Sequence, residues 1–211
     1  MSAITSPSGR ARCAQCLRPQ PACICRWIAP VVSQAGLLIL QHPMEVAHAK
    51  GSARLLHLSV AGSQLACGEV FAPAELQQLL AQEGRTPLLL YPDLPGERAL
   101  GIAAPPPLEA ARRSDPARIL LVVLDATWRK SRKMLYLNPL LQALPRLPLR
   151  AVPASKYVIR KAHAPDQLST LEASCHALAQ LEGAPDKYTP LLDSFAQFVA
   201  CYQASGGTLA P

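Results

Sequence analysis

The stretch that decides the fold is Ile119–Asp125, which reads ILLVVLD and ends on a carboxylate. Six consecutive apolar residues suffice for a buried strand but fall far short of the roughly 18 that a membrane helix needs. Two similar runs occur earlier, GLLILQ at Gly36–Gln41 and PLLLY at residues 87–91. Continuous apolar runs are typical of strands covered on both faces. The sequence therefore predicts an α/β fold, with a mainly parallel sheet and helices on both faces.

The remaining segments fit the same class. Short strands are expected at Gln64–Cys67 and at residues 147–152. Helices are expected at 46–58, 73–82, 126–137, 168–181 and 188–202, with a proline-rich loop at 101–116. Ligands of such folds bind at the carboxyl ends of the strands. The candidate sites are therefore the segments after Gln41, after Tyr91 and after Leu124.

The chain has 211 residues, a formal charge of +7 and 50% hydrophobic residues. This length suits one domain, and this composition excludes a fully disordered or collagen-like chain. The positive charge suits a polyanionic partner such as nucleic acid, although a merely basic surface explains it equally well. The first residues show no basic-then-apolar targeting pattern, so we expect a soluble, cytoplasmic protein with no membrane partner.

Four of the seven cysteines lie close together near the start, at Cys13, Cys16, Cys23 and Cys25. Four thiolates at this spacing can hold one tetrahedral Zn²⁺ with every position filled, which makes a structural site. The alternative is four free thiols in a mobile tail. We favour zinc, because the turns between these cysteines contain no apolar core that would fold without a metal. We expect a disordered leader at 1–12, this zinc-binding segment at 13–30 and the α/β domain at 31–211.

The best strand ends at Asp125 and leads into a helix that Thr127 can cap. Trp128 and Leu135 lie seven residues apart on this helix and could face inward. Three cations of this helix share one face at i, i+3 and i+4: Arg129, Arg132 and Lys133. Like charges on one face cost stability unless an anion compensates. Either phosphate groups of a nucleic acid compensate them or the face is simply solvated.

Two further segments are candidates. His42, at the end of the first strand, either contacts a ligand or satisfies loop carbonyls. Ser169 or Thr170 can cap a late helix, and Ser169 with Glu172 fits a capping box. The N-terminus of that helix also suits a carboxylate-bearing ligand. The sequence contains no G-x-G-x-x-G, P-loop, H-E-x-x-H or G-x-S-x-G motif, which argues against four common enzyme classes.

The chain resembles the DTW-domain family, because four motifs occur in the order that is found there. They are the four-cysteine cluster, the HP-x-E turn at 42–45, the D-x-T-W signature at 125–128 and the R-K…S-T-x-E-A segment at 160–173. This family is similar to the tRNA-uridine aminocarboxypropyltransferases. The resemblance covers roughly residues 13–175. It departs at Gly51-Ser52, where the family often has Asn-Thr after the lysine, and at His163, near a usual proline.

The resemblance implies a SPOUT-like fold with a C-terminal trefoil knot. It also implies S-adenosylmethionine as the donor, whose 3-amino-3-carboxypropyl group moves to N3 of a tRNA uridine while methylthioadenosine leaves. Uridine N3 carries a proton, and Asp125 is placed to remove it as a general base. Thr127 and Trp128 complete the expected catalytic group, with Trp128 stacking on a base.

We expect the donor to contact eight residues: His42, Pro43, Leu124, Arg160, Leu168, Ser169, Thr170 and Glu172. Arg160 and the backbone of 168–170 would hold its carboxylate. The expected tRNA contacts are Arg12, Arg18, Lys50, Arg129, Arg132, Lys133 and Lys161. Three alternatives remain open: an S-adenosylmethionine-dependent RNA methyltransferase of the same fold class, a related transferase acting on ribosomal RNA, and a non-catalytic zinc-containing RNA-binding module.

Overall fold

In a computed structural model, four parallel strands form one sheet in the order β2-β1-β4-β3. The strands are β1 (Gly36–Gln41), β2 (Gln64–Cys67), β3 (Thr86–Leu89) and β4 (Ile119–Asp125). The structure describes residues 11–46, 48, 51–108, 115–149 and 168–205. Every residue of β4 is buried, as its unbroken apolar run predicts. The predicted α/β class and parallel sheet are therefore confirmed.

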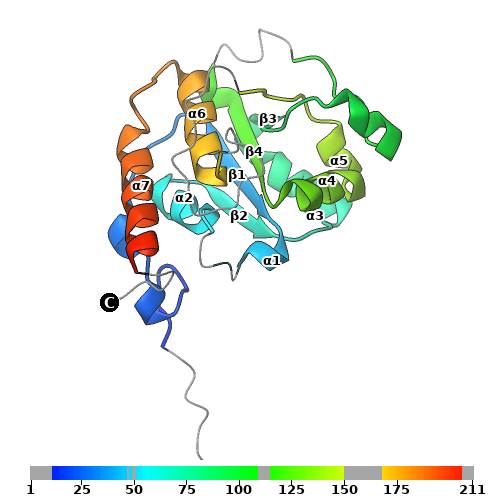
Figure 1. Cartoon of the computed structure of the whole chain (residues 1–211). Coiled ribbons are helices and arrows are strands. Elements are labelled where there is room, and N and C mark those ends of the chain that lie inside the picture. Colours follow the sequence, from blue (N-terminus) through cyan, green and yellow to red (C-terminus); the bar gives the residue numbers. More distant parts are fainter. Residues whose placement is uncertain (1–10, 47, 49–50, 109–114, 150–167, 206–211) are drawn as a thin grey trace, which may run out of the picture.

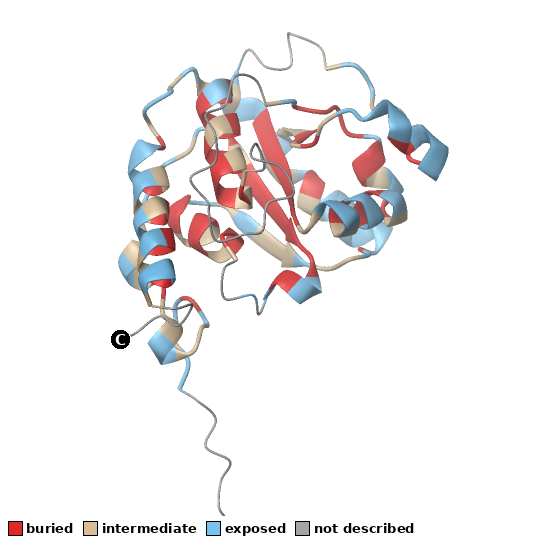
Figure 2. Ribbon diagram, viewed as in Figure 1, coloured by how far each residue is buried: buried red, intermediate tan, exposed pale blue. Residues whose placement is uncertain are grey.

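Helices cover both faces of the sheet. They are α1 (Pro43–Val46), α2 (Ala53–Ser59), α3 (Pro73–Leu80), α4 (Trp128–Leu137), α5 (Pro139–Gln142), α6 (Thr170–Glu182) and α7 (Thr189–Ala204). Figure 1 shows α2, α6 and α7 on one side and α3, α4 and α5 on the other. Leu37 and Ile39 pack with the first group, and Leu38 and Leu40 with the second, because successive strand residues point to opposite faces. The buried strands lie between these two layers (Figure 2).

Short 3-10 helices occupy several connections: η1 (Gln20–Ala22), η2 (Cys25–Trp27), η3 (Gln82–Gly84), η4 (Pro95–Leu100) and η6 (Pro116–Arg118). Proline stands in the first turn of η1, η4 and η6, where its missing N–H is not needed. The proline-rich composition is thus used to start short elements.

The strand register brings three carboxyl ends together. Gln41 at the end of β1 pairs with Asp125 on β4 and with Cys67 on β2. Strand β3 stops earlier, with Leu89 opposite Val122. The loops that follow β1, β2 and β4 therefore begin side by side, at the edge where ligands of parallel sheets bind.

Two expected elements differ in the structure. The helix expected at 46–58 is confirmed only from Ala53 onward, because α1 ends at Val46 and α2 spans Ala53–Ser59. Between them, the N–H of His48 donates to the carbonyl of Glu45, and that of Gly51 to the carbonyl of His48. Each of these bonds joins residues three positions apart, whereas the bonds of an α-helix join residues four apart, so the helix does not continue here.

The strand expected at 147–152 is not found in its described residues, 147–149; the structure has only an isolated parallel bridge between Arg146 and Leu89 just before them. Residues 150–152 lie outside the described part of the chain, as do residues 150–167 of the segment expected to form a trefoil knot.

The N-terminal cysteine segment packs on the domain. Cys16 and Ile24 belong to the hydrophobic cluster that also contains the buried residues of α2 and α7. The hydroxyl of Ser194 on α7 donates to the carbonyl of Trp27, at 2.7 Å. Among the described residues, no helix is long and apolar enough to cross a membrane.

Candidate active site and metal centre

Asp125 lies where β1, β4 and α6 meet. Its Oδ2 accepts a hydrogen bond from Nε2 of Gln41 at 2.8 Å, and its Oδ1 accepts one from the hydroxyl of Thr170 at 2.6 Å. Only 6% of the residue is exposed. Donated hydrogen bonds of this kind stabilise the negative charge of a buried carboxylate. Residues 45 positions apart in the sequence thus share one bond, which joins the D-x-T-W signature to the S-T-x-E-A segment.

The start of α6 has the capping box that the sequence predicts. The hydroxyl of Ser169 accepts from the N–H of Glu172 at 3.2 Å, and the Glu172 carboxylate accepts from the N–H of Ser169 at 2.8 Å. The N–H of Leu171 donates to the hydroxyl of Ser52 at 3.3 Å. These bonds already occupy three of the backbone N–H groups that the sequence analysis offered to a ligand carboxylate.

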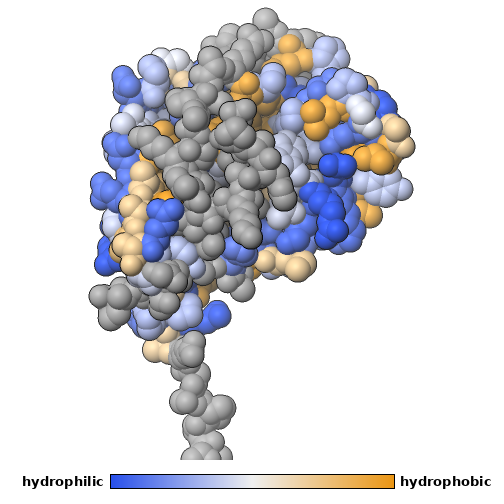
Figure 3. Space-filling view, viewed as in Figure 1, coloured by the Kyte–Doolittle hydropathy of each residue, from blue (hydrophilic) through white to orange (hydrophobic). Residues whose placement is uncertain are grey.

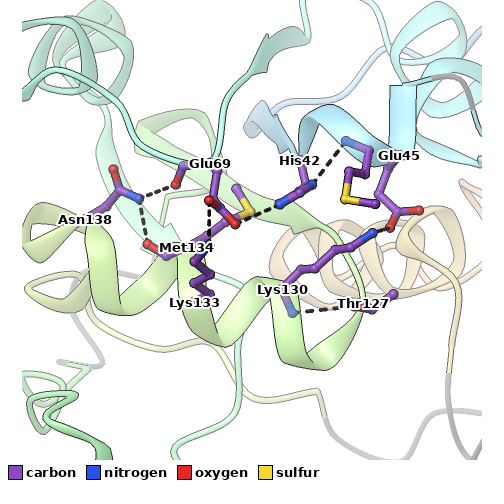
Figure 4. A network of polar contacts seen from close by, with 9 residues as sticks. His42, Glu45, Glu69, Thr127, Lys130, Lys133, Met134 and Asn138 are labelled. Atoms are coloured by element: carbon purple, nitrogen blue, oxygen red, sulfur yellow. Dashed lines mark hydrogen bonds and ion pairs between the residues drawn. The ribbon is translucent and has the colours of Figure 1, made fainter.

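His42 is held by a carboxylate rather than by loop carbonyls. Its Nε2 lies 3.0 Å from Glu69, and its Nδ1 accepts from the N–H of Met44 at 3.1 Å (Figure 4). Because Nδ1 accepts, Nε2 carries the proton and donates to Glu69. The hydrogen bond from Lys133, followed by that from His42, lowers the pKa of Glu69 below its ordinary value.

Glu69 is itself positioned by Asn138. The side-chain amide of Asn138 donates to the carbonyls of Glu69 and Met134, at 2.9 and 2.6 Å, while its oxygen accepts from the N–H of Phe71 at 2.9 Å (Figure 4). This buried amide ties the loop after β2 to the end of α4. The sequence gives no periodic signal for such a contact.

Protein carboxylates compensate most of the cations on α4. Lys130 pairs with Glu45 at 2.9 Å, Lys133 with Glu69 at 2.9 Å, and Arg132 lies 3.5 Å from Glu97. The side chains of Lys133 and Arg132 remain 59% and 44% exposed. Figure 3 shows hydrophilic side chains gathered over α4. The like charges are thus tolerated without a bound phosphate, yet they stay accessible to one.

Trp128, which could have faced inward, is 42% exposed, whereas Leu135 is fully buried. Thr127 caps α4 as expected, accepting from the N–H of Lys130 at 3.4 Å. The Trp128 ring meets Tyr91 edge-on, with centroids 5.5 Å apart. The Tyr91 hydroxyl donates to Glu97 at 2.9 Å, and burial, then this bond, raises the pKa of Tyr91. An indole that is braced on one side and exposed on the other can stack on a nucleobase.

The four clustered cysteines converge on one point. Their sulfur atoms all lie within 4.8 Å of one another, with Cys13 and Cys25 at 3.5 Å and Cys16 and Cys23 at 3.8 Å. Four thiolates around a tetrahedral Zn²⁺ with bonds of about 2.3 Å would have sulfurs about 3.8 Å apart. The cluster therefore fits a closed tetrahedral metal site. Hydrogen bonds from the backbone of Cys16 and Gln15, then that from the Cys25 thiol, lower the pKa of Cys13 to about 6, whereas burial, then the hydrogen bond with Cys13, raises the pKa of Cys25.

The N-terminal cysteine segment contacts the loop that leads to α2. The guanidinium of Arg18 donates to the carbonyl of Gly51 at 2.9 Å. The next residue is Ser52, whose hydroxyl binds the start of α6. A continuous set of contacts thus connects this segment to α6, whose Thr170 hydroxyl donates to Asp125 at the end of β4.

The other expected site residues are spread over the chain. Arg12, Pro43 and Arg129 are exposed, Leu168 is half-buried, and Leu124 is buried at the end of β4. Lys50, Arg160 and Lys161 lie outside the described residues. The sequence analysis missed Gln41, Ser52, Glu69 and Tyr91. Gln41 was the easiest to find, because a polar residue that ends an apolar strand run lies beside the end of the neighbouring strand.

The fold and site together define an α/β domain with a buried carboxylate at the edge of its sheet and a cluster of four cysteines that could hold a metal ion. The chain belongs to the DTW domain family, whose model matches residues 10–203. It is similar to two curated proteins named tRNA-uridine aminocarboxypropyltransferase 2, from Mus musculus and Macaca fascicularis. Each is 28% identical over 180 residues, covering 82% of this chain and 57% of the relative. The chain thus spans little more than half the length of these relatives. No solved structure matches it.

Proposed function

We propose that the chain is a transferase that moves the 3-amino-3-carboxypropyl group of S-adenosylmethionine to N3 of a uridine in tRNA. The N3 proton leaves, N3 forms a bond to the side-chain carbon next to sulfur, and the carbon–sulfur bond breaks. The sulfonium becomes the neutral thioether of methylthioadenosine, so charge and atoms balance. Membership of the DTW domain family and the printed names of the relatives support this proposal.

Asp125 accepts the N3 proton in this proposal. Gln41 and Thr170 hold the carboxylate in one orientation, each using one lone pair of one oxygen. The bond between Asp125 and Thr170 is the single observation that carries the proposal, because it joins the family's two late motifs at the ligand-binding edge of the sheet.

The donor has to be oriented so that the side-chain carbon, and not the methyl group, faces N3. S-adenosylmethionine supplies a carbon activated by its sulfonium. We assign its binding to His42, Pro43, Leu124, Leu168 and Thr170 near the Asp125 edge, supported by Ser169 and Glu172, and to Arg160, which lies outside the described residues. Because Ser169 and Glu172 cap α6 for each other, their role is to fix the helix start rather than to contact the donor directly.

The tRNA would lie over α4 and the N-terminal cysteine segment. Trp128 stacks on a base beside Asp125, with Thr127 fixing the start of the helix that presents it. The cations assigned to phosphates are Arg12, Arg18, Lys50, Arg129, Arg132, Lys133 and Lys161. Zn²⁺ bound by the four cysteines would hold the N-terminal segment rigid. We propose a cytoplasmic location for the protein.

The test is incubation with unmodified tRNA and S-adenosylmethionine, followed by mass spectrometry of the nucleosides. The proposal predicts a uridine heavier by one aminocarboxypropyl group. A methylated nucleoside would instead make the chain an RNA methyltransferase, and modification of ribosomal RNA alone would exclude tRNA as substrate. Failure to bind S-adenosylmethionine in calorimetry would leave a zinc-containing RNA-binding module.

A further inference from the structure

Arg146 is a buried cation outside the Asp125 edge. It is only 6% exposed, and its Nε and Nη1 atoms are buried without a hydrogen-bond partner among the described residues. Its backbone bridges to Leu89, which fixes it beside the edge strand β3. A buried guanidinium without partners costs free energy, so native proteins seldom keep one unless a ligand completes it.

The groups around Arg146 do not complete its hydrogen bonds. Its guanidinium carbon lies 5.1 Å from the centre of the Tyr91 ring. The face of an aromatic ring has no lone pair that could accept a hydrogen bond from the N–H groups in the guanidinium plane. Asp93 is already paired with Arg98 at 2.6 Å, and Glu97 accepts from Tyr91. Burial lowers the pKa of Arg146, whereas the charges of these carboxylates oppose the shift. Among the described residues, Nε and Nη1 of this guanidinium therefore have no hydrogen-bond acceptor.

Arg146 also forms part of the wall of a cavity of about 540 Å³. Among the described residues, apolar side chains make up most of the wall, including the prolines at 105–107, Leu147 and Leu181. Its polar groups are Asp93, Arg146 and Gln180. An apolar cavity with a few polar groups is typical of a small-molecule site. Tyr91 contacts both Arg146 and Trp128, so one aromatic ring lies between this guanidinium and the indole assigned to base stacking.

We propose that Arg146 binds the α-carboxylate of the amino-acid tail of S-adenosylmethionine through its unpaired N–H groups. This inference rests on the proposed function and adds a described cation to the contact assigned to Arg160. A carboxylate matches the fork of an arginine. An RNA phosphate is the other source of such an oxyanion, but the depth of Arg146 and the nearby Asp93 and Glu97 disfavour a polyanionic backbone.

The test compares Arg146→Met with wild type, because methionine fills much of the arginine stem without its charge. Arg118→Met, on exposed η6, is the control for the loss of one positive charge. Calorimetry uses three probes: S-adenosylmethionine, its decarboxylated analogue, and methylthioadenosine, which lacks the tail. Wild type and Arg118→Met should prefer the carboxylate-bearing probe by about 10- to 100-fold, as a charged hydrogen-bonded pair implies. Arg146→Met should lose most of this preference, since only the contact assigned to Arg160 remains, and keep its affinity for methylthioadenosine.

A second readout separates ligand binding from a structural role. Without ligand, Arg146→Met should melt at the same temperature as wild type or higher, because an unpaired buried charge is removed. A clearly lower Tm together with an unchanged preference for the carboxylate would overturn the inference. Arg146→Lys, which keeps the charge but not the fork, should show a reduced preference and serves if the methionine variant does not fold.

The remaining outcomes are also distinct. If Arg146→Met still transfers the group and still prefers the carboxylate, the inference is wrong and the proposed function stands. If only the affinity for tRNA falls, the ligand is a phosphate and the carboxylate assignment is wrong. If wild type binds no S-adenosylmethionine, the proposed function and the inference fall together.

Discussion

Asp125→Asn and Thr170→Val separate the chemical role of Asp125 from its structural role. The valine variant removes the partly buried hydroxyl that donates to the buried carboxylate of Asp125 at 2.6 Å. A hydrogen bond to a charged group contributes about 1.5–3 kcal/mol, so the free energy of unfolding should fall by ~2 kcal/mol. For a domain of this size, that lowers Tm by about 4–8 °C. The Asp125 carboxylate stays in place, so the variant should retain measurable turnover.

The asparagine variant should be destabilised to a similar degree. Its amide oxygen can still accept from Gln41, and its NH₂ can donate to the Thr170 hydroxyl, which then acts as acceptor. Both bonds survive without the charge, at a cost of about 1 kcal/mol each. The proton acceptor is lost, so turnover should fall by about 10²–10⁴-fold while binding of S-adenosylmethionine persists.

The assay is transfer to tRNA under single-turnover conditions, alongside thermal melting and calorimetry. Equal losses of turnover in the two variants would refute the reasoning, because Asp125 would then act only by holding α6 against the sheet.

Three further predictions concern the surroundings of this site. If the seven assigned cations contact phosphates, affinity for tRNA should fall by about 10³-fold between about 50 and 200 mM salt, and a flat response in filter binding would contradict that assignment. Purified protein should contain one Zn²⁺ by elemental analysis, whereas Cys16→Ser should lose it and melt at a lower temperature; wild-type metal content in that variant would exclude Cys16 as a ligand. Because the pKa of Glu69 is lowered in the folded state, its contribution to stability is present above its ordinary pKa of about 4.3 and is lost as the pH falls through the lowered value. Glu69→Gln should therefore flatten the acid limb of the stability profile, and an unchanged limb would show that this pairing contributes nothing.

Much of the sheet could be predicted because local patterns carry it. The apolar runs of β1 and β4 are long and uninterrupted, and they match the observed strands in full. The caps provided by Thr127 and Ser169 were also predictable, since an N-cap depends on residues within one turn. The convergence of the four cysteines followed from their spacing, because four thiols on short turns cannot lie far apart.

The contacts between distant segments could not be predicted in this way. Glu69 and Lys133 are 64 residues apart, and the pairing depends on where the loop after β2 meets α4. Trp128 shares a helical spacing with Leu135, yet only Leu135 is buried. The helix begins at Trp128, so this residue lies at the exposed edge of the sheet rather than over the core. The environment of Trp128 therefore depends on its place at the start of the helix, and helical periodicity alone does not give that place.

The central claim is that the aminocarboxypropyl group, and not the methyl group, reaches a tRNA uridine. The most direct measurement uses two preparations of S-adenosylmethionine, one labelled in the carboxyl carbon and one in the methyl carbon, each incubated with the protein and unmodified tRNA. The account predicts that the carboxyl label enters tRNA while the methyl label leaves in methylthioadenosine. Entry of the methyl label into tRNA, or of neither label, would contradict it.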